Sequence, residues 1–138
     1  YRRLIELGPP SENPYFSTAS NNLGYLLAQR GEQLDEAERL IKQALDVEPA
    51  AGYILDSLGW VYFQKGEYEK ARQYLERAAK VSDQDAEVYL HLGEVYEKLG
   101  QREDALSMYQ KALETNPELD AAREKRDALM LAEQQSSL

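Results

Sequence analysis

Three residues of this chain carry side chains suited to nucleophilic catalysis. Asp56 and Ser57 are adjacent, and His91 is the only histidine. A carboxylate, a hydroxyl and an imidazole are the groups that many hydrolases combine to activate a nucleophile. That chemistry requires a strained turn at the serine and an oxyanion pocket beside it, whereas Ser57 and His91 both lie in ordinary helical patterns. We therefore predict that the chain is not an enzyme and that His91 is a polar residue of a binding surface.

The acidic residues suggest a second kind of chemistry, which is metal binding. Two groups of carboxylates, at 35–38 and 67–69, fall in the first turns of expected helices. There they complement the positive end of the helix dipole and face solvent, which explains them without a metal. The chain has no cysteine, and it shows no zinc, calcium-loop or phosphate-loop spacing. We predict neither a metal site nor a cofactor.

The composition limits the classes of partner. Of the 138 residues, 43% are hydrophobic and 30% are charged, which fits a helical protein with a real core. The formal net charge is -9. Because phosphates are neutralised by clustered Lys and Arg, a chain this acidic is a poor nucleic-acid binder, and anionic membranes would repel it. No apolar run is long enough for a membrane span, so direct membrane insertion is not expected.

The elements that carry these residues repeat along the chain. The pairs Leu23-Gly24, Leu58-Gly59 and Leu92-Gly93 each lie in a helical pattern that ends at a second glycine. The last two pairs are 34 residues apart and the first two are 35 apart, which places one extra residue in the first turn, at 31–34. A helix–turn–helix unit with this period is typical of a repeat array.

The glycine inside each first helix predicts how the two helices of a unit pack. Glycine within a helix costs about 1 kcal/mol relative to alanine, so something must offset the cost. Each second helix carries two alanines seven positions apart, such as Ala71 and Ala78. Small residues facing a glycine allow the two helix axes to approach closely.

These features resemble the tetratricopeptide repeat (TPR) family. In each unit a large residue follows the Leu-Gly pair by three positions, and the units close with Pro49, Asp83 and Pro117, of which Asp83 departs from the family pattern. The resemblance implies an all-α fold: an α-solenoid of three repeats with a partial N-terminal helix and a C-terminal capping helix. We expect a single domain, 1–138, that contains the tail of a preceding repeat at 1–13, repeats at 17–51, 52–85 and 86–119, and a capping helix at 120–133.

The family resemblance also implies a binding groove, because the first helices of stacked TPR units line a concave surface. Four aromatics lie in the middle of it, at Tyr25, Tyr53, Trp60 and Phe63, and aromatic side chains are enriched at binding hot spots. Alternatively, Trp60 and Phe63 pack against a neighbouring repeat and expose only an edge. The predicted groove residues are Asn21, Tyr25, Gln29, Tyr53, Asp56, Trp60, Phe63, Gln64, Leu90, His91, Glu94 and Lys98.

Some TPR domains grip the C-terminal carboxylate of a chaperone with Lys, Arg and Asn side chains. The matching positions here are Asn21, Tyr25, Ser57, Glu87 and His91, so one Asn is kept and an acid replaces a required cation. Chaperone-tail binding is therefore not expected. A peptide segment with apolar anchors and some basic residues suits the groove better.

We interpret the chain as a protein–protein interaction scaffold that belongs to a larger protein, since it opens on Tyr1 inside a helical pattern. Its repeats look especially like the C-terminal repeats of long bacterial TPR proteins, some of which are envelope lipoproteins. The alternative function is a structural spacer or self-association module, in which exposed aromatics contact a second copy. The partner and the compartment, cytoplasm or cell envelope, are left open.

Overall fold

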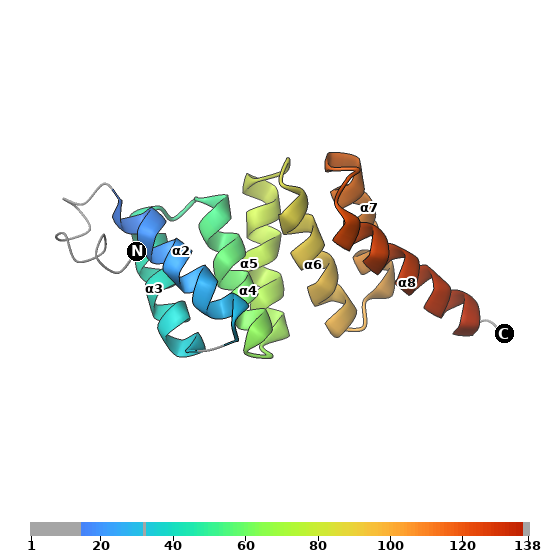
Figure 1. Ribbon diagram of the computed structural model, residues 1–138, viewed down its shortest axis with the longest axis horizontal. Coiled ribbons are helices and arrows are strands. Elements are labelled where there is room, and N and C mark those ends of the chain that lie inside the picture. Colours follow the sequence, from blue (N-terminus) through green and yellow to red (C-terminus); the bar gives the residue numbers. More distant parts are fainter. Residues whose placement is uncertain (1–14, 32, 137–138) are drawn as a thin grey trace. The chain divides into compact units, whose positions relative to one another are not determined.

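The computed structural model describes residues 15–31 and 33–136, and every regular element in them is an α-helix (Figure 1). This confirms the predicted all-α repeat fold. The helices are α2 (Phe16–Gln29), α3 (Leu34–Val47), α4 (Gly52–Gln64), α5 (Tyr68–Val81), α6 (Ala86–Lys98), α7 (Arg102–Thr115) and α8 (Asp120–Ser136).

The chain divides into two compact units, and the boundary in the sequence falls between Val81 and Ser82. In the first unit α2 packs on α3 and α4 packs on α5, and these two helical hairpins are joined by contacts of α4 with both α2 and α3. In the second unit α6 packs on α7, and α7 in turn packs on α8. Each hairpin can be followed in Figure 1 as two helices linked by a short turn.

The turn inside the second and third hairpins has the same hydrogen-bond pattern. After α4, Gly66 adopts a left-handed φ of 80°, and the backbone N–H of Glu67 donates to the carbonyl of Tyr62 at 2.9 Å. After α6, Gly100 has a φ of 77° and the N–H of Gln101 donates to Tyr96 at 2.9 Å. This is the Schellman arrangement, in which glycine tolerates the left-handed backbone and satisfies helix-end carbonyls.

The glycine inside each first helix packs directly against the second helix, as the sequence predicts, but the side chain that it faces is large and is not one of the expected alanines. A Cβ added to Gly59 would lie 2.6 Å from Cγ of Leu75, and one added to Gly93 would lie 2.5 Å from Cε1 of Tyr109. Gly24 approaches Ile41 in the same way. These distances leave no room for a methyl group, so the missing side chain is what allows the close approach.

An ion-pair network also holds α4 against α3. Lys65, which follows the last residue of α4, donates to Asp35 at 2.8 Å and to Glu38 at 3.0 Å, and Lys42 pairs with Glu38 at 3.0 Å. Hydrogen bonds and charge from Lys65 lower the pKa of Asp35. Burial alone would raise the pKa of Glu38, but the hydrogen bonds from Lys42 and Lys65 outweigh it and lower that pKa.

The repeat limits at 17–51, 52–85 and 86–119, the capping role of 120–133 and the single-domain organisation stay predictions. The predicted tail of a preceding repeat, at 1–13, lies outside the described residues.

Candidate functional site

The candidate site of the first unit is one side of α4. Five of its residues recur at three- and four-residue spacing and therefore share one stripe of the helix. We call this stripe, which also belongs to the predicted groove, the α4 face. It consists of Tyr53, Asp56, Trp60, Phe63 and Gln64. The rest of α4 supplies the core, because Ile54, Leu55, Leu58 and Val61 are almost completely buried.

Exposure varies along the α4 face. Tyr53 is 42% exposed and Gln64 is exposed, Trp60 and Phe63 are partly exposed, and Asp56 is largely buried at 9%. The alternative interpretation, in which Trp60 and Phe63 are covered by packing, is therefore only partly met. The face presents apolar ring surface with one carboxylate among it.

The aromatic residues at the end of this face form a row of three rings. Trp60 and Phe63 stack with their ring centroids 4.7 Å apart and their planes 7° from parallel. Phe63 in turn meets Tyr68 of α5 at 5.5 Å with a tilt of 59°. We call Trp60, Phe63 and Tyr68 the aromatic row, and each of the three is partly exposed. Contacts among the rings limit their rotamers, so the row is organised before any partner arrives.

Tyr53 is fixed at the other end of the α4 face. Its hydroxyl donates to a carboxylate oxygen of Glu48 at 2.7 Å. Burial and the Glu48 carboxylate raise the pKa of Tyr53, and the same hydrogen bond lowers the pKa of Glu48. The phenol therefore stays protonated near neutral pH and acts as a hydrogen-bond donor.

Helix α2 lies beside α4 and contributes the other predicted residues of this unit. Tyr25 is partly exposed, Gln29 is exposed, and Asn21 is buried at 4%. Within the described residues the side-chain oxygen of Asn21 has no hydrogen-bond donor. Tyr25 and Gln29 can therefore meet a ligand directly, whereas Asn21 is covered.

The predicted residues of the second unit are less accessible. Leu90 and His91 of α6 are 6% and 5% exposed. Glu94 is partly exposed and its carboxylate lies 3.3 Å from the ammonium of Lys125 on α8, while Lys98 is exposed at the end of α6. The groove assignment of all twelve residues stays a prediction.

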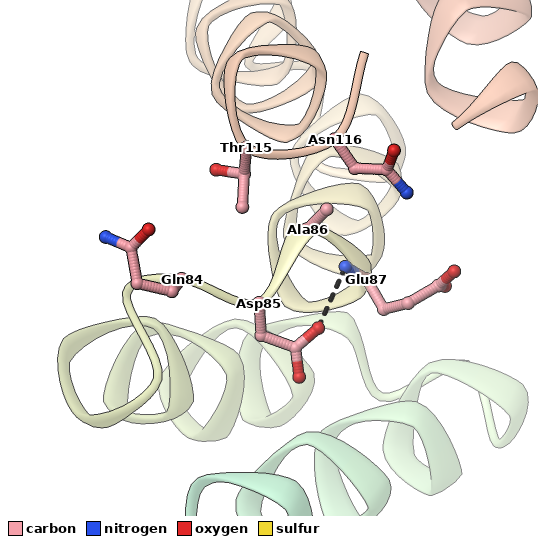
Figure 2. Close-up of a pocket in the computed structure, with 6 residues that line it drawn as sticks. All are labelled: Gln84, Asp85, Ala86, Glu87, Thr115 and Asn116. Carbon is pink, nitrogen blue, oxygen red and sulfur yellow. Dashed lines mark hydrogen bonds between the residues drawn. The ribbon is translucent and has the colours of Figure 1, made fainter. Parts of the chain in front are cut away.

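The structure adds hollows that the sequence analysis does not identify. A hollow of about 440 Å³ lies between the start of α6 and the end of α7, and Figure 2 shows the six residues around it, with Asp85 accepting a hydrogen bond from the N–H of Glu87 at 3.1 Å. An apolar hollow of about 340 Å³ in the first unit is lined by Phe16 and Val47 together with Gln43 and Asp46. Both are formed by helix ends, which periodicity along one helix cannot reveal.

The side chains considered for catalysis are buried, and the serine is also hydrogen-bonded within its own helix. The Ser57 hydroxyl donates to the carbonyl of Tyr53 at 3.0 Å, an ordinary bond to the preceding turn of its helix. Ser57 is 4% exposed and His91 is 5% exposed. Among the residues that the structure describes, no three His, Cys, Asp or Glu side chains gather as a metal site would require. In the same part of the chain no helix is long and apolar enough to cross a membrane.

Consecutive helical hairpins built on the same plan are typical of helical-repeat proteins. Two family models match the sequence: one described as TPR repeat over residues 59–100, and one described as Tetratricopeptide repeat over residues 86–119. These matches assign residues 59–119 to the tetratricopeptide repeat family.

Similar proteins agree with this assignment. A TPR repeat-containing protein of Pseudomonas aeruginosa is 38% identical over 82 residues, which is 59% of this chain and 14% of that protein. The chain therefore spans only a small part of the curated relative it matches.

Solved structures share the fold. The Sgt2 TPR domain from Aspergillus fumigatus superposes with a TM-score of 0.82 at 22% identity, covering 94% of this chain and 87% of that one. The first TPR of Spaghetti (RPAP3), solved with the HSP90 peptide SRMEEVD, gives a TM-score of 0.78 at 19% identity, covering 85% of this chain and 92% of that one.

Proposed function

We propose that this chain is a protein-interaction scaffold that binds a segment of a partner protein on the surface formed by α2 and α4. The observation that carries the proposal is the partly exposed aromatic row, in which Trp60 and Phe63 lie on α4, the first helix of its hairpin, and Tyr68 lies on α5. Aromatic side chains bury much area at small cost in rotamer entropy, and this makes them frequent binding hot spots. The TPR fold supports an interaction role, since stacked repeats present extended surfaces to their partners.

The partner segment is anchored by apolar side chains. Trp60 and Phe63 offer ring surface, Tyr25 adds a third ring from α2, and Gln29 and Gln64 at the helix ends supply polar contacts at the rim. A segment that presents two or three apolar side chains on one side matches this distribution. In the second unit, the partly exposed carboxylate of Glu94 on α6 disfavours an anionic ligand on that helix.

The test is selection of peptides from a displayed library on the immobilised chain, followed by titration in solution. Trp60 is the only tryptophan, so its fluorescence reports on ligand binding at the aromatic row. We expect Trp60→Ala and Tyr25→Ala to weaken the selected peptides by at least about fivefold, the effect of losing more than 1 kcal/mol at an interface position. Calorimetry provides the affinities of the tryptophan-free variant.

Leu131→Ala is the matched control, because Leu131 is 55% exposed on α8 and belongs to the second unit. Its affinity for the peptides should be unchanged. Retention of full affinity by both Trp60→Ala and Tyr25→Ala would contradict the proposal. Light scattering tests the alternative of self-association: a dimer that Trp60→Ala converts to a monomer would favour it over peptide binding.

A further inference from the structure

We propose that the aromatic row of Trp60, Phe63 and Tyr68 binds a cationic side chain of the partner segment, arginine in preference to lysine. This inference rests on the proposed function and deepens it, because it states which chemistry the α4 face selects. It is carried by the geometry of the rings and by the charges of α2 and α4.

The aromatic row presents ring faces on which a cation can lie. The face of an aromatic ring carries negative electrostatic potential, strongest for tryptophan, and attracts a cation within about 6 Å of the centroid. Trp60 and Phe63 stack with their planes 7° from parallel, so each ring covers part of one face of the other and the outer faces of the stack are the surface that a cation can meet. Tyr68 is tilted by 59° at its edge and forms a second wall. A planar guanidinium can stack on such a surface, whereas an ammonium is compact and more strongly hydrated.

The same chemistry already occurs elsewhere in this chain. The ammonium of Lys70 lies 5.4 Å from the ring centroid of Tyr62, and the guanidinium of Arg77 lies 5.4 Å from that of Tyr74. In the second unit, Lys111 lies 5.9 Å from the ring of Tyr89. Lysine and arginine side chains therefore do lie over aromatic rings of these helices.

The charge of the α2–α4 surface favours a cation from outside. Helices α2 and α4 contain no lysine or arginine, and their only carboxylate is Asp56, one helical turn before Trp60 on the α4 face. Lys65, at the end of α4, is held by Asp35 and Glu38. An incoming arginine thus meets aromatic surface without a competing cation, whereas an incoming carboxylate finds no lysine or arginine on these two helices.

The experiment compares matched peptides on the full chain. The starting probe is the tightest peptide from the display selection, acetylated and amidated so that its ends carry no charge. At its basic position arginine is replaced in turn by lysine, by citrulline, which is a neutral isostere, and by glutamate. We expect the arginine peptide to bind about 3- to 30-fold more tightly than the citrulline peptide, the range that one cation–π contact supplies. Lysine should fall between them, and glutamate should bind most weakly.

Two variants test whether the aromatic row causes the preference for a charged side chain over a neutral one. Phe63→Leu keeps apolar surface but removes the ring, so the arginine-to-citrulline ratio should fall towards one while the citrulline peptide keeps its affinity. Phe63→Tyr retains a ring and should retain the ratio. Circular dichroism checks folding, and Tyr68→Leu takes the place of Phe63→Leu if that variant is unfolded.

The outcomes separate the two proposals. If no selected peptide binds through the α4 face, the proposed function fails and the inference fails with it. If peptides bind and quench Trp60 but arginine and citrulline give equal affinities, or if the selected peptides contain no basic residue, only the inference is overturned. A ratio that survives both Phe63→Leu and Tyr68→Leu would likewise overturn it, since another part of the surface would then select the cation.

Discussion

At the scale of single residues, the glycine within each first helix controls how closely two helices pack. Gly59 faces Leu75, and an added Cβ would also lie 3.3 Å from the carbonyl oxygen of Ala71. Leu75 is completely buried and cannot move into solvent. The helix therefore tolerates the poor helix propensity of glycine because the alternative is a steric clash in the core.

We predict that Gly59→Ala destabilises the first unit by about 1–3 kcal/mol, because overpacking exceeds the gain in helix propensity. Urea unfolding followed by circular dichroism measures the change. In a Leu75→Ala background the methyl group has room, so the same substitution should be neutral or stabilising there. Equal effects of Gly59→Ala in both backgrounds would show that the contact with Leu75 is not the cause.

At the scale of elements, the link between α2 and α3 differs from the other two hairpin turns. Residues 30–33 separate these helices, whereas 65–67 and 99–101 separate the others, so the extra residue predicted for the first turn is present. Gln33 takes a left-handed backbone there, with a φ of 51° and a ψ of 45°. The first turn thus places a residue with a side chain where glycine is favoured.

We predict that Gln33→Gly stabilises the first unit by about 0.5–1 kcal/mol. Relief of the left-handed conformation, about 1–2 kcal/mol, exceeds the added entropy of glycine in the unfolded chain. Gln101→Gly is the control, because Gln101 precedes α7 in the same way but has a φ of -96°. That substitution should destabilise, and thermal unfolding of both variants measures the difference in sign.

The ion pairs between α3 and α4 predict a pH dependence of stability. Folding lowers the pKa values of Asp35 and Glu38 from 3.8 and 4.5. Their contribution to the unfolding free energy is therefore complete above 3.8 and 4.5, and it is lost as the pH falls through the lower pKa values of the folded chain. Hydrogen bonds to the same carboxylates raise the pKa of Lys65, so its contribution is lost only at strongly alkaline pH.

Lys65→Met should therefore reduce the part of the unfolding free energy that disappears between about pH 6 and pH 3. Urea unfolding at a series of pH values measures it. Lys98→Met serves as the control, because Lys98 is an exposed lysine at the end of α6. This substitution should not change how much unfolding free energy is lost at acid pH. If Lys65→Met and the natural chain lose the same unfolding free energy between about pH 6 and pH 3, the ion-pair network does not titrate as inferred.

At the scale of the whole molecule, the net charge of this chain is unfavourable for an acidic ligand. The structure of the Spaghetti (RPAP3) domain contains the acidic peptide SRMEEVD. Here the formal net charge is -9, and the positions that matched a carboxylate grip in the sequence hold Asn21, Tyr25, Ser57, Glu87 and His91. Asn21, Ser57 and His91 are also buried.

We predict that the peptide SRMEEVD binds this chain at least about tenfold more weakly than peptides selected on it, because the net charge repels an acidic ligand and helices α2 and α4 offer it no lysine or arginine. Fluorescence titration of Trp60 and calorimetry measure the affinities. Raising the ionic strength should narrow the difference, since screening reduces the repulsion. An affinity for SRMEEVD equal to that of the selected peptides would contradict the charge argument.

The sequence alone determined the all-α repeat architecture. The 34-residue spacing of Gly59 and Gly93, with alanines on each second helix, was sufficient because helix periodicity and close glycine packing are local requirements. Periodicity also placed Tyr53, Asp56 and Trp60 on one side of α4.

Only the tertiary structure decided how much of each predicted site residue reaches solvent. Trp60 and Phe63 stay partly exposed, whereas Asn21, Asp56, Leu90 and His91 are largely covered. It also formed the aromatic row, since Tyr68 belongs to another helix and meets Phe63 only across a turn. The physical reason is that helical spacing specifies the direction of a side chain, while its burial depends on the neighbouring helices that pack over it.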